Sequence, residues 1–449
     1  MLLISPIYFW WWSEPSLGLG LIASALERLG IRPKVIDCQV TRNYKRRIIE
    51  SLRDYPTVGI SSTIGTISSA LEIASFIRQN SPKTRIIMGG PHPTAIYDKL
   101  LPRYADIVVL GEGEDTITEL MQEKDLSKIK GIAYWDGSLK VNERRPLIED
   151  LDRLGFPAWH LFDLKRYRSL HAHIPFVPMI TSRGCPYQCI YCTKFVHGSK
   201  MRLRSVENVL SEIDYLVNSF GVKEIQIVDD NFTFYQSWVK ELCVSIITKD
   251  FNGLRFVSGG IRADNVDLEI FSLLKKAGFY LVNIGVESGS EDVLNKVGKA
   301  IKLDKIKETI NIAKSTGLEV RAAFMFGLPF DTKETMLQTL NFAKSLAVDN
   351  AAFGIAVPFP GTAFYEIVRN KGRLLEDLAM NSVCFYSGKS VYETDALKAK
   401  DIEGIYRKAR RQFYFRPSQF WRAINLKISS ISLIPRLIKY GYDLLFYRR

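Results

Sequence analysis

The chain has 449 residues, of which 47% are hydrophobic and 24% are charged, a composition typical of a soluble globular protein with two or three domains. Its six cysteines are too few and too scattered for a disulfide framework, so we expect a reduced, cytoplasmic location. No cationic side chain precedes Arg28 and no apolar run reaches about 18 residues, so we expect neither a signal peptide nor a membrane-spanning helix.

The N-terminal third alternates short apolar runs with helical patterns. This alternation predicts an α/β domain over residues 1–130, built on an open, Rossmann-like parallel sheet. Ligands of such sheets bind at the carboxyl ends of the strands. The predicted strands are Leu2–Ser5, Lys34–Asp37, Val58–Ser61, Arg85–Met88 and Ile107–Leu110, and the predicted helices lie near 18–29, 43–53, 66–79 and 94–101.

Small and polar residues follow three of these strands. Glycines let a backbone approach a large flat ligand, and hydroxyl groups can bond to its polar edges. Taken alone, the same residues fit ordinary turns better than a binding site. The candidates are Ser61, Ser62 and Thr63 after the third strand, Gly89 and Gly90 after the fourth, and Glu112 within the Gly111–Glu114 run after the fifth.

Residues 131–176 are expected to connect two domains. Ile132–Trp135 and Leu139–Asn142 predict a β-hairpin with a tight turn. Residues 146–176 are rich in proline, arginine and aromatic residues without a clean period, which indicates a linker packed between the domains. The linker contains three histidines, for which we expect surface or packing roles, with a metal or substrate contact as the alternative for the last two: His160, His171 and His173.

Cys185, Cys189 and Cys192 share one loop with the spacing C-x3-C-x2-C. Three thiolates this close can hold three irons of a cubane cluster and leave the fourth iron open to a cosubstrate. His197 offers a fourth ligand, so a zinc site is one alternative, and three buried structural thiols are another. The remaining cysteines are scattered, so we expect no second cluster.

This run resembles the cluster loop of the radical S-adenosylmethionine (SAM) enzymes, in which an aromatic residue such as Tyr191 precedes the last cysteine. The resemblance implies a [4Fe-4S] cluster on Cys185, Cys189 and Cys192, whose open iron is chelated by the amino and carboxylate groups of SAM. It further implies that the reduced cluster cleaves SAM to methionine and a 5′-deoxyadenosyl radical.

Residues 177–375 repeat a strand followed by a helix. This alternation predicts a barrel or part of one, with its chemistry at the carboxyl ends of the strands. The resemblance implies a six-stranded (β/α)6 partial TIM barrel. The predicted strands are Val177–Ser182, Glu224–Val228, Arg255–Ser258, Leu281–Val286, Glu319–Phe324 and Ala352–Val357, and the helices run near 205–219, 235–249, 266–277, 290–297, 303–316 and 332–346.

Charged and small residues gather at these strand ends: Asp229, Asp230, Arg262, Glu287, Ser288, Gly327 and Pro329. Carboxylates suit an ammonium group or a ribose diol, and arginine suits a carboxylate. The resemblance implies that Asp229 and Asp230 replace the family's methionine-binding motif, and that Glu287, followed by Ser288, contacts the ribose or the methionine. It also implies that Gly327 and Pro329 lie beside the adenine. Arg262 is a candidate contact to a carboxylate or to the substrate, although each residue alone also fits a helix N-cap.

Residues 376–449 form a predicted helical, basic and aromatic C-terminal region. The segment 404–449 carries eleven lysines and arginines against one acid, and so supplies most of the net charge of +13. Basic and aromatic residues together favour contact with an anionic membrane surface. A packed terminal helix is the plain alternative, and RNA binding is the least favoured. The aromatic run Trp10–Trp12 is expected to line an apolar substrate channel or to pack on the barrel.

An open α/β domain placed directly before this cysteine loop resembles the cobalamin-binding subclass of the radical SAM enzymes. The resemblance implies that Ser61–Thr63 and Gly89–Gly90 line the nucleotide tail or the corrin of a cobalamin. The D-x-H-x-x-G signature of other cobalamin domains is absent. We therefore expect cobalamin to bind without a histidine lower ligand, and a vestigial domain without cofactor remains open.

The resemblance extends to the class of the anaerobic magnesium-protoporphyrin ester cyclases and the carbon methyltransferases, over roughly residues 1–375. It implies methylation of an unactivated carbon on an apolar, lipid-like or tetrapyrrole-like small molecule. An oxidative cyclase, a methylthiotransferase and a non-enzymatic metal or nucleic-acid module are the alternatives. We expect flavodoxin or ferredoxin as electron donor, no nucleic-acid partner, and a cytoplasmic protein with peripheral contact to the inner face of the membrane.

Overall fold

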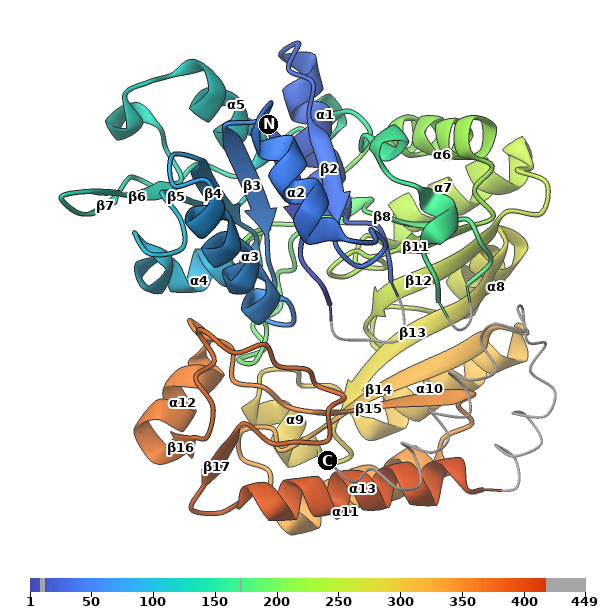
Figure 1. Ribbon diagram of the computed structural model, residues 1–449. Coiled ribbons are helices and arrows are strands. Elements are labelled where there is room, and N and C mark those ends of the chain that lie inside the picture. The colour runs from blue at the N-terminus through green and yellow to red at the C-terminus, as the bar shows by residue number, and fades with distance from the viewer. Residues whose placement is uncertain (9–12, 170–171, 417–449) are drawn as a thin grey trace.

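The structure is a computed structural model that describes residues 1–8, 13–169 and 172–416. Two sheets flanked by helices face one another, one from each half of the chain (Figure 1). The predictions for Trp10–Trp12, for His171 and for residues 417–449 lie outside the described residues.

The N-terminal sheet has seven strands in the order β2-β1-β3-β4-β5-β6-β7, and its first five strands are parallel. The alternation of strands and helices predicted this arrangement, and the predicted α/β class is confirmed. The strands are β1 (Leu2–Ser5), β2 (Lys34–Asp37), β3 (Thr57–Ser61), β4 (Arg85–Gly89) and β5 (Ile107–Val109), and the helices are α1 (Leu17–Arg28), α2 (Tyr44–Leu52), α3 (Ile67–Asn80), α4 (Pro91–Leu100) and α5 (Glu114–Gln122).

The predicted hairpin forms, but it belongs to the N-terminal sheet and not to a separate connector. Its strands β6 (Ile132–Asp136) and β7 (Ser138–Val141) continue the N-terminal sheet, because β6 pairs antiparallel with β5. The expected boundary near residue 130 therefore falls inside one sheet. Backbone pairing explains the difference, since β5 would otherwise be an edge strand with unpaired amides.

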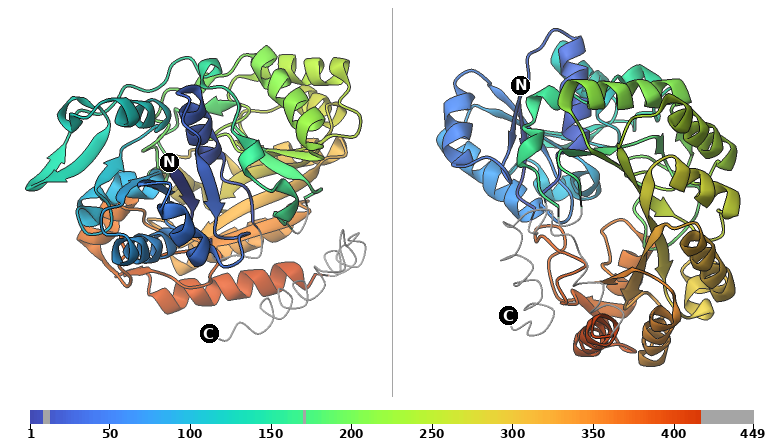
Figure 2. Two further views of the ribbon diagram at one scale, coloured as in Figure 1. Left: turned by 45° about the horizontal axis from the view of Figure 1, so that its top comes forward. Right: turned by 90° about the vertical axis from the view of Figure 1, so that its right-hand side faces the viewer.

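The second sheet has six parallel strands in the order β8-β11-β12-β13-β14-β15. It curves into an open partial barrel with helices on its outer face (Figure 2). The strands are β8 (Phe176–Met179), β11 (Glu224–Ile227), β12 (Arg255–Ile261), β13 (Phe279–Glu287), β14 (Glu319–Phe326) and β15 (Asn350–Ile355). The helices are α6 (Val206–Phe220), α7 (Gln236–Lys249), α8 (Leu268–Lys276), α9 (Glu291–Lys296), α10 (Leu303–Ser315), α11 (Lys333–Ser345) and α12 (Ala363–Lys371).

The helix caps follow from local sequence. The side chains of Ser205, Asp267, Ser290, Thr332 and Thr362 each accept a hydrogen bond from a backbone N–H in the first turn of the next helix. Such caps stabilise a helix N-terminus by about 1 kcal/mol each. They fix where each helix begins, and hence the length of the loop at each strand end.

The C-terminal part packs on both halves of the molecule. Strands β16 (Gly372–Leu374) and β17 (Tyr392–Thr394) pair, so the expected boundary at residue 375 divides a strand pair. Between them, Ser382 exchanges hydrogen bonds of 2.7 and 2.9 Å with Ser68 of α3. Helix α13 (Ala399–Tyr414) lies along α11 and β15.

Helix α13 tests the prediction for the first part of the basic tail. Its aromatic residues Tyr406 and Phe413 are buried in the core, and Tyr414 donates a hydrogen bond of 2.6 Å to the Ala351 carbonyl. Up to residue 416 these aromatic residues thus pack inside the protein, with Phe415 as the exposed exception. Among the described residues, no helix is both long and apolar enough to cross a bilayer.

Candidate active site

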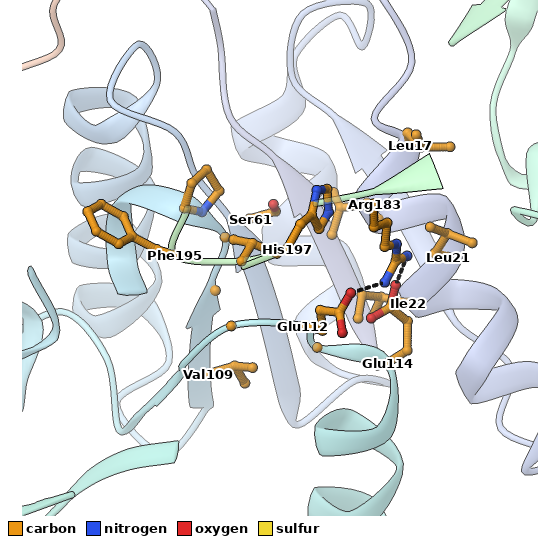
Figure 3. A pocket seen from close by; sticks show the side chains of 18 of the residues that line it. Leu17, Leu21, Ile22, Ser61, Val109, Glu112, Glu114, Arg183, Phe195 and His197 are labelled. Atoms are coloured by element: carbon orange, nitrogen blue, oxygen red, sulfur yellow. Dashed lines mark hydrogen bonds and ion pairs between the residues drawn. The ribbon is translucent and has the colours of Figure 1, made fainter. Parts of the chain in front are cut away.

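A cavity of about 450 Å³ lies between the carboxyl ends of the N-terminal strands and the cysteine loop (Figure 3). Its volume falls within the range of small-molecule sites. One wall comes from α1, β1, β3, β4 and the β5–α5 loop, and the other from residues 180–198 with Val228 and Asp230. The predicted site residues that line it are Ser61, Gly89, Gly90, Glu112, Cys185, Cys192 and Asp230.

The N-terminal wall of the cavity is apolar and rich in glycine. Met1, Leu3 and Ile22 line it, together with Gly59 and Gly113. A Cβ atom on Gly59 would lie 2.6 Å from the Met1 Cε atom, and one on Gly113 would lie 3.0 Å from the Ile22 Cδ1 atom. These glycines therefore leave room for the Met1 and Ile22 side chains that line the cavity.

The turns beside this wall explain two further glycine and serine positions. Gly90 has φ of +103°, and a Cβ there would lie 2.6 Å from the Ser62 carbonyl oxygen. Ser62 is buried, and its hydroxyl lies 3.1 Å from the Thr66 hydroxyl, while Thr63 donates its amide to the same Thr66 hydroxyl. Ser61 thus lines the cavity, whereas Ser62 and Thr63 shape the turn behind it.

The cysteine loop is held by backbone contacts from three directions. Ile190 donates its amide to the Val297 carbonyl and accepts one from Phe364, both at 3.1 Å. Cys185 donates its amide to the Gly198 carbonyl at 3.4 Å. A loop tied down at its start and its middle can present its three thiols in a fixed arrangement.

The thiols themselves are free and partly accessible. Although Cys192 is exposed as a residue, desolvation of its sulfur by the surrounding loop raises the pKa of the thiol to about 11, and the neighbouring thiols Cys189 and Cys185 add to the shift. Burial also raises the pKa of Cys185. In the ranges 1–8, 13–169 and 172–416, no three His, Cys, Asp or Glu side chains converge on one metal-ion position.

Asp229 and Asp230 are neighbours at the end of β11 with different surroundings. Asp229 is buried and accepts hydrogen bonds from the Thr181 amide at 2.7 Å, from the Thr181 hydroxyl at 2.5 Å and from the Ser182 hydroxyl at 2.7 Å. Burial raises its pKa despite these bonds. Asp229 therefore anchors the segment that leads into the cysteine loop, and it does not line the cavity.

Asp230 reaches the cavity. Its Oδ2 atom accepts hydrogen bonds from the Gly184 amide at 2.9 Å and from His197 Nδ1 at 3.1 Å. Burial acts to raise its pKa, but the hydrogen bond and charge of His197 outweigh this and hold the pKa below its usual value. His197, considered above as a zinc ligand, is thus paired with Asp230.

Arg262 at the end of β12 braces the cysteine loop. Its guanidinium forms two hydrogen bonds to the Asp264 carboxylate, at 3.0 and 2.9 Å, and donates to the Lys299 carbonyl at 2.8 Å. The same group stacks 3.6 Å from the ring centroid of Tyr187, between the first two cysteines. The contacts of the Arg262 guanidinium in the structure are thus to other residues of the protein, and its predicted contact to a ligand carboxylate or to the substrate stays a prediction.

Glu287 ends β13 in the left-handed region, with φ of +70°, which is uncommon for a residue other than glycine. Its Oε1 atom lies 2.9 Å from Lys299 Nζ, and both side chains are largely buried. Burial first, and then the charge of Glu287, raise the pKa of the nearby Tyr191. Ser288 is buried, with its hydroxyl 3.2 Å from that of Thr339, and so supports the turn.

The end of β14 is packed against the C-terminal part. Gly327 has φ of +79°, and its carbonyl accepts a hydrogen bond from the buried hydroxyl of Tyr392. Pro329 is buried as well. Asp331 accepts hydrogen bonds from the Leu328 amide at 2.9 Å and from the Thr335 hydroxyl at 2.6 Å, which closes this turn.

Four buried charged residues join the N-terminal sheet to the cysteine loop. Glu112 accepts hydrogen bonds from Arg183 and Arg202, both at 2.9 Å, and from the Ile148 amide at 2.8 Å. Arg183 also lies 2.5 Å from Glu114, as the dashed lines in Figure 3 mark. Burial alone would raise the pKa of Glu112, but the two arginines hold it below its usual value.

Two family models match this architecture. The model for the radical SAM superfamily matches residues 179–343, which include the three cysteines and most of the barrel. The model for the B12 binding domain matches residues 13–121, which include the glycine-rich strand ends.

An uncharacterized methyltransferase of Pyrococcus horikoshii is 30% identical over 414 residues, which cover 90% of this chain and 88% of that protein. The chain belongs to the radical SAM enzymes that carry a B12-binding domain. A cytidylyl-2-hydroxyethylphosphonate methyltransferase of Streptomyces wedmorensis is 25% identical, over 91% of this chain and 88% of that one. An anaerobic magnesium-protoporphyrin IX monomethyl ester cyclase of Rubrivivax gelatinosus is 24% identical, over 87% and 72%.

Solved structures of radical SAM enzymes share the fold. The methyltransferase TsrM of Kitasatospora setae, solved with cobalamin and a [4Fe-4S] cluster, superposes with a TM-score of 0.68 at 19% identity, over 82% of this chain and 77% of that one. The cobalamin-dependent enzyme OxsB gives 0.74 at 18% identity, over 92% and 66%. These likenesses confirm the predicted fold class for a radical SAM enzyme with a B12-binding domain.

Sequence reasoning did not assign the partners of the charged site residues. Arg183 and Arg202 flank the cysteine loop, and Lys299 follows Glu287 by 12 residues. The one available signal was the pair of acids in Gly111–Glu114, which require cations if they are buried. Sequence alone does not show that these acids are buried.

Proposed function

We propose that this radical SAM enzyme is a cobalamin-dependent methyltransferase that acts on an unactivated carbon of an apolar small molecule. The proposal rests on one observation: the same cavity is lined by strand-end residues of the N-terminal sheet and by two cysteines of the loop. These residues are Ser61, Gly89 and Gly90 on one side and Cys185 and Cys192 on the other. A site that touches both walls can bring a methyl carrier and a SAM-cleaving cluster to one substrate.

The N-terminal wall fits a cobalamin. Its apolar, glycine-lined inner part suits a flat aromatic base, and the backbone at Gly89 and Gly90 allows a close approach. His92 does not line the cavity, and its Nε2 atom lies 3.2 Å from the Ala379 carbonyl. We therefore propose that cobalamin binds here without a histidine lower ligand.

The second wall fits a SAM-binding [4Fe-4S] cluster on Cys185, Cys189 and Cys192. When bound, the cluster and cobalamin would supply the electron that cleaves SAM and the methyl group for transfer. The Oδ1 atom of Asp230 has no hydrogen-bond partner among the described residues, so it is available to the ammonium group of SAM. We propose that Glu287, held by Lys299, bonds to the ribose or the methionine.

Apolar side chains near the barrel strand ends support an apolar substrate. Phe359 and Phe385 form an edge-to-face pair with ring centroids 5.4 Å apart, just beyond β15. The Phe385 carbonyl accepts a hydrogen bond from the Ile355 amide at 2.8 Å, which fixes that segment against the strand end. A lipid-like or tetrapyrrole-like molecule suits such aromatic surfaces.

We also propose an electron donor and a peripheral membrane contact for this enzyme. The net charge of +13 favours an acidic electron donor such as flavodoxin or ferredoxin. Peripheral membrane contact rests on residues 417–449, because the described part of the tail packs inward. Flotation of the full chain with anionic vesicles tests that contact, and the free cysteines are consistent with the proposed cytoplasmic location.

The test is anaerobic reconstitution with iron, sulfide and cobalamin, followed by incubation with SAM and a reductant. About four irons and one cobalamin per chain, with release of both S-adenosylhomocysteine and 5′-deoxyadenosine, are expected. A preparation that holds the cluster but binds no cobalamin would contradict the methyltransferase. Formation of 5′-deoxyadenosine without S-adenosylhomocysteine would instead favour an oxidative cyclase, the activity by which one of the relatives is named.

A further inference from the structure

We infer that the buried network of Glu112, Glu114, Arg183 and Arg202 positions the cobalamin wall of the cavity against the SAM wall, and so controls methyl transfer from SAM separately from reductive SAM cleavage. This inference rests on the proposed function. The four residues would act by positioning the two walls, and none of them would take part in the chemical steps.

The network joins the two elements that must be aligned. Glu112 and Glu114 lie on the β5–α5 side of the cavity, and Arg183 lies two residues before Cys185. Arg202 sits on the strand β10 (Arg202–Leu203), which pairs with the strand β9 (Ser182–Arg183). Through these contacts, a shift of either wall would break a buried ion pair.

Burial makes the network stiff. The side chains of Arg183, Glu112 and Arg202 are only 2–3% exposed, and that of Glu114 is 8% exposed. Water cannot replace a broken bond at such positions, so loss of one partner leaves an uncompensated charge. Arg183 binds Glu112 with one terminal nitrogen and Glu114 with the other, which fixes its plane as well as its distance.

The two SAM reactions differ in what they require. Reductive cleavage needs SAM on the cluster and one electron from a low-potential donor; the S–C5′ bond breaks into methionine and a 5′-deoxyadenosyl radical. Methyl transfer to cobalt breaks the S–CH3 bond, leaves its electron pair on sulfur as S-adenosylhomocysteine, and uses the cobalt(I) electron pair for the new bond. Only the second reaction depends on the distance between the two walls.

The experiment compares Glu112→Gln with the reconstituted wild-type holoenzyme. We expect S-adenosylhomocysteine formation to fall about 10- to 100-fold, since small misplacements cost this much, while 5′-deoxyadenosine formation stays within about twofold. Pulsed EPR between cob(II)alamin and the reduced cluster should show a broader distance distribution. Glu212→Gln is the matched control, because its equally buried pair with Arg204 does not involve the N-terminal sheet.

If Glu112→Gln does not fold, Glu114→Gln, which removes a single partner of Arg183, carries the same expectation. Parallel loss of both products in a folded variant would overturn the inference, as would unchanged product ratios and distances. If the wild type itself forms neither product, the proposed function fails; if the wild type forms both and the variants behave like it, the inference alone fails.

Discussion

The two walls of the cavity differ in the chemistry of the side chains that line them. The N-terminal wall uses mainly glycines and aliphatic side chains such as Met1, Leu3, Gly59 and Gly113, and its carboxylates are paired with arginines. The barrel wall carries the thiols of Cys185 and Cys192 and charged groups such as Asp230, which is paired with His197. The first wall can select a ligand by shape, and the second can hold charge in fixed places.

This contrast predicts that substitutions on one wall should leave the function of the other intact. A change that fills the N-terminal wall should remove cobalamin and spare SAM cleavage. A change that removes a barrel charge should weaken SAM binding and spare cobalamin.

The largest effect is expected from Cys185→Ala. The variant lacks one of three iron ligands, so 5′-deoxyadenosine formation after anaerobic reconstitution should fall below about 1% of the wild-type rate. Cobalamin binding, measured by absorbance after gel filtration, should persist because the N-terminal wall is unchanged. Cys243→Ala, in the buried face of α7, is the control and should keep SAM cleavage; activity in Cys185→Ala would refute the cluster assignment.

The two neighbouring aspartates provide the next test. Asp230→Asn should raise the KM for SAM about 10- to 100-fold, because an ion-assisted hydrogen bond to the SAM ammonium group is lost. Asp229→Asn should instead lower the free energy of unfolding by about 1–3 kcal/mol, because its buried donors Thr181 and Ser182 lose acceptors. Steady-state kinetics and denaturant titration of both variants separate the roles, and identical behaviour would contradict them.

A smaller effect is expected from Gly59→Val on the N-terminal wall. The added side chain would collide with Met1 and Leu3 and displace them into the cavity that they line, so we expect about a tenfold weaker cobalamin affinity. SAM cleavage should change little. Val58→Ile adds volume on the opposite, buried face of the same strand and should leave cobalamin affinity unchanged, as measured by titration. Unchanged affinity in Gly59→Val would place cobalamin elsewhere.

Local sequence patterns predicted the strands and helices, but they did not predict the ion pairs. The strands β1 to β5 and the six barrel strands are short segments rich in apolar residues, and the turn residues and helical patterns between them locate their ends. The partners of Glu112 lie 71 and 90 residues away, and that of Glu287 lies 12 residues away. Such pairs depend on how finished elements meet, so composition and spacing cannot predict them. The same holds for the hairpin, whose pairing with β5 is a tertiary contact.

The last prediction concerns the pH dependence of stability, which involves residues outside the cavity. Burial raises the pKa of Asp37 and that of Asp331 to about 6 each, although the hydroxyls of Tyr167 and Thr335 act to lower them. The folded-state pKa of each carboxyl group exceeds its value in the unfolded chain. The folded protein therefore binds these two protons at a higher pH than the unfolded chain does. Stability should therefore rise as the pH falls from above 6 towards 4, by up to about 3 kcal/mol per residue.

Asp331→Asn tests this contribution. The amide oxygen still accepts one hydrogen bond, but the group no longer titrates, so the variant should lose part of the pH dependence of its melting temperature between pH 4.5 and 7.5. The exposed Asp136→Asn is the control and should follow the wild type. A wild-type and an Asp331→Asn profile that run parallel would mean that Asp331 keeps an ordinary pKa, and that the turn after β14 is open to water rather than sealed by Tyr392.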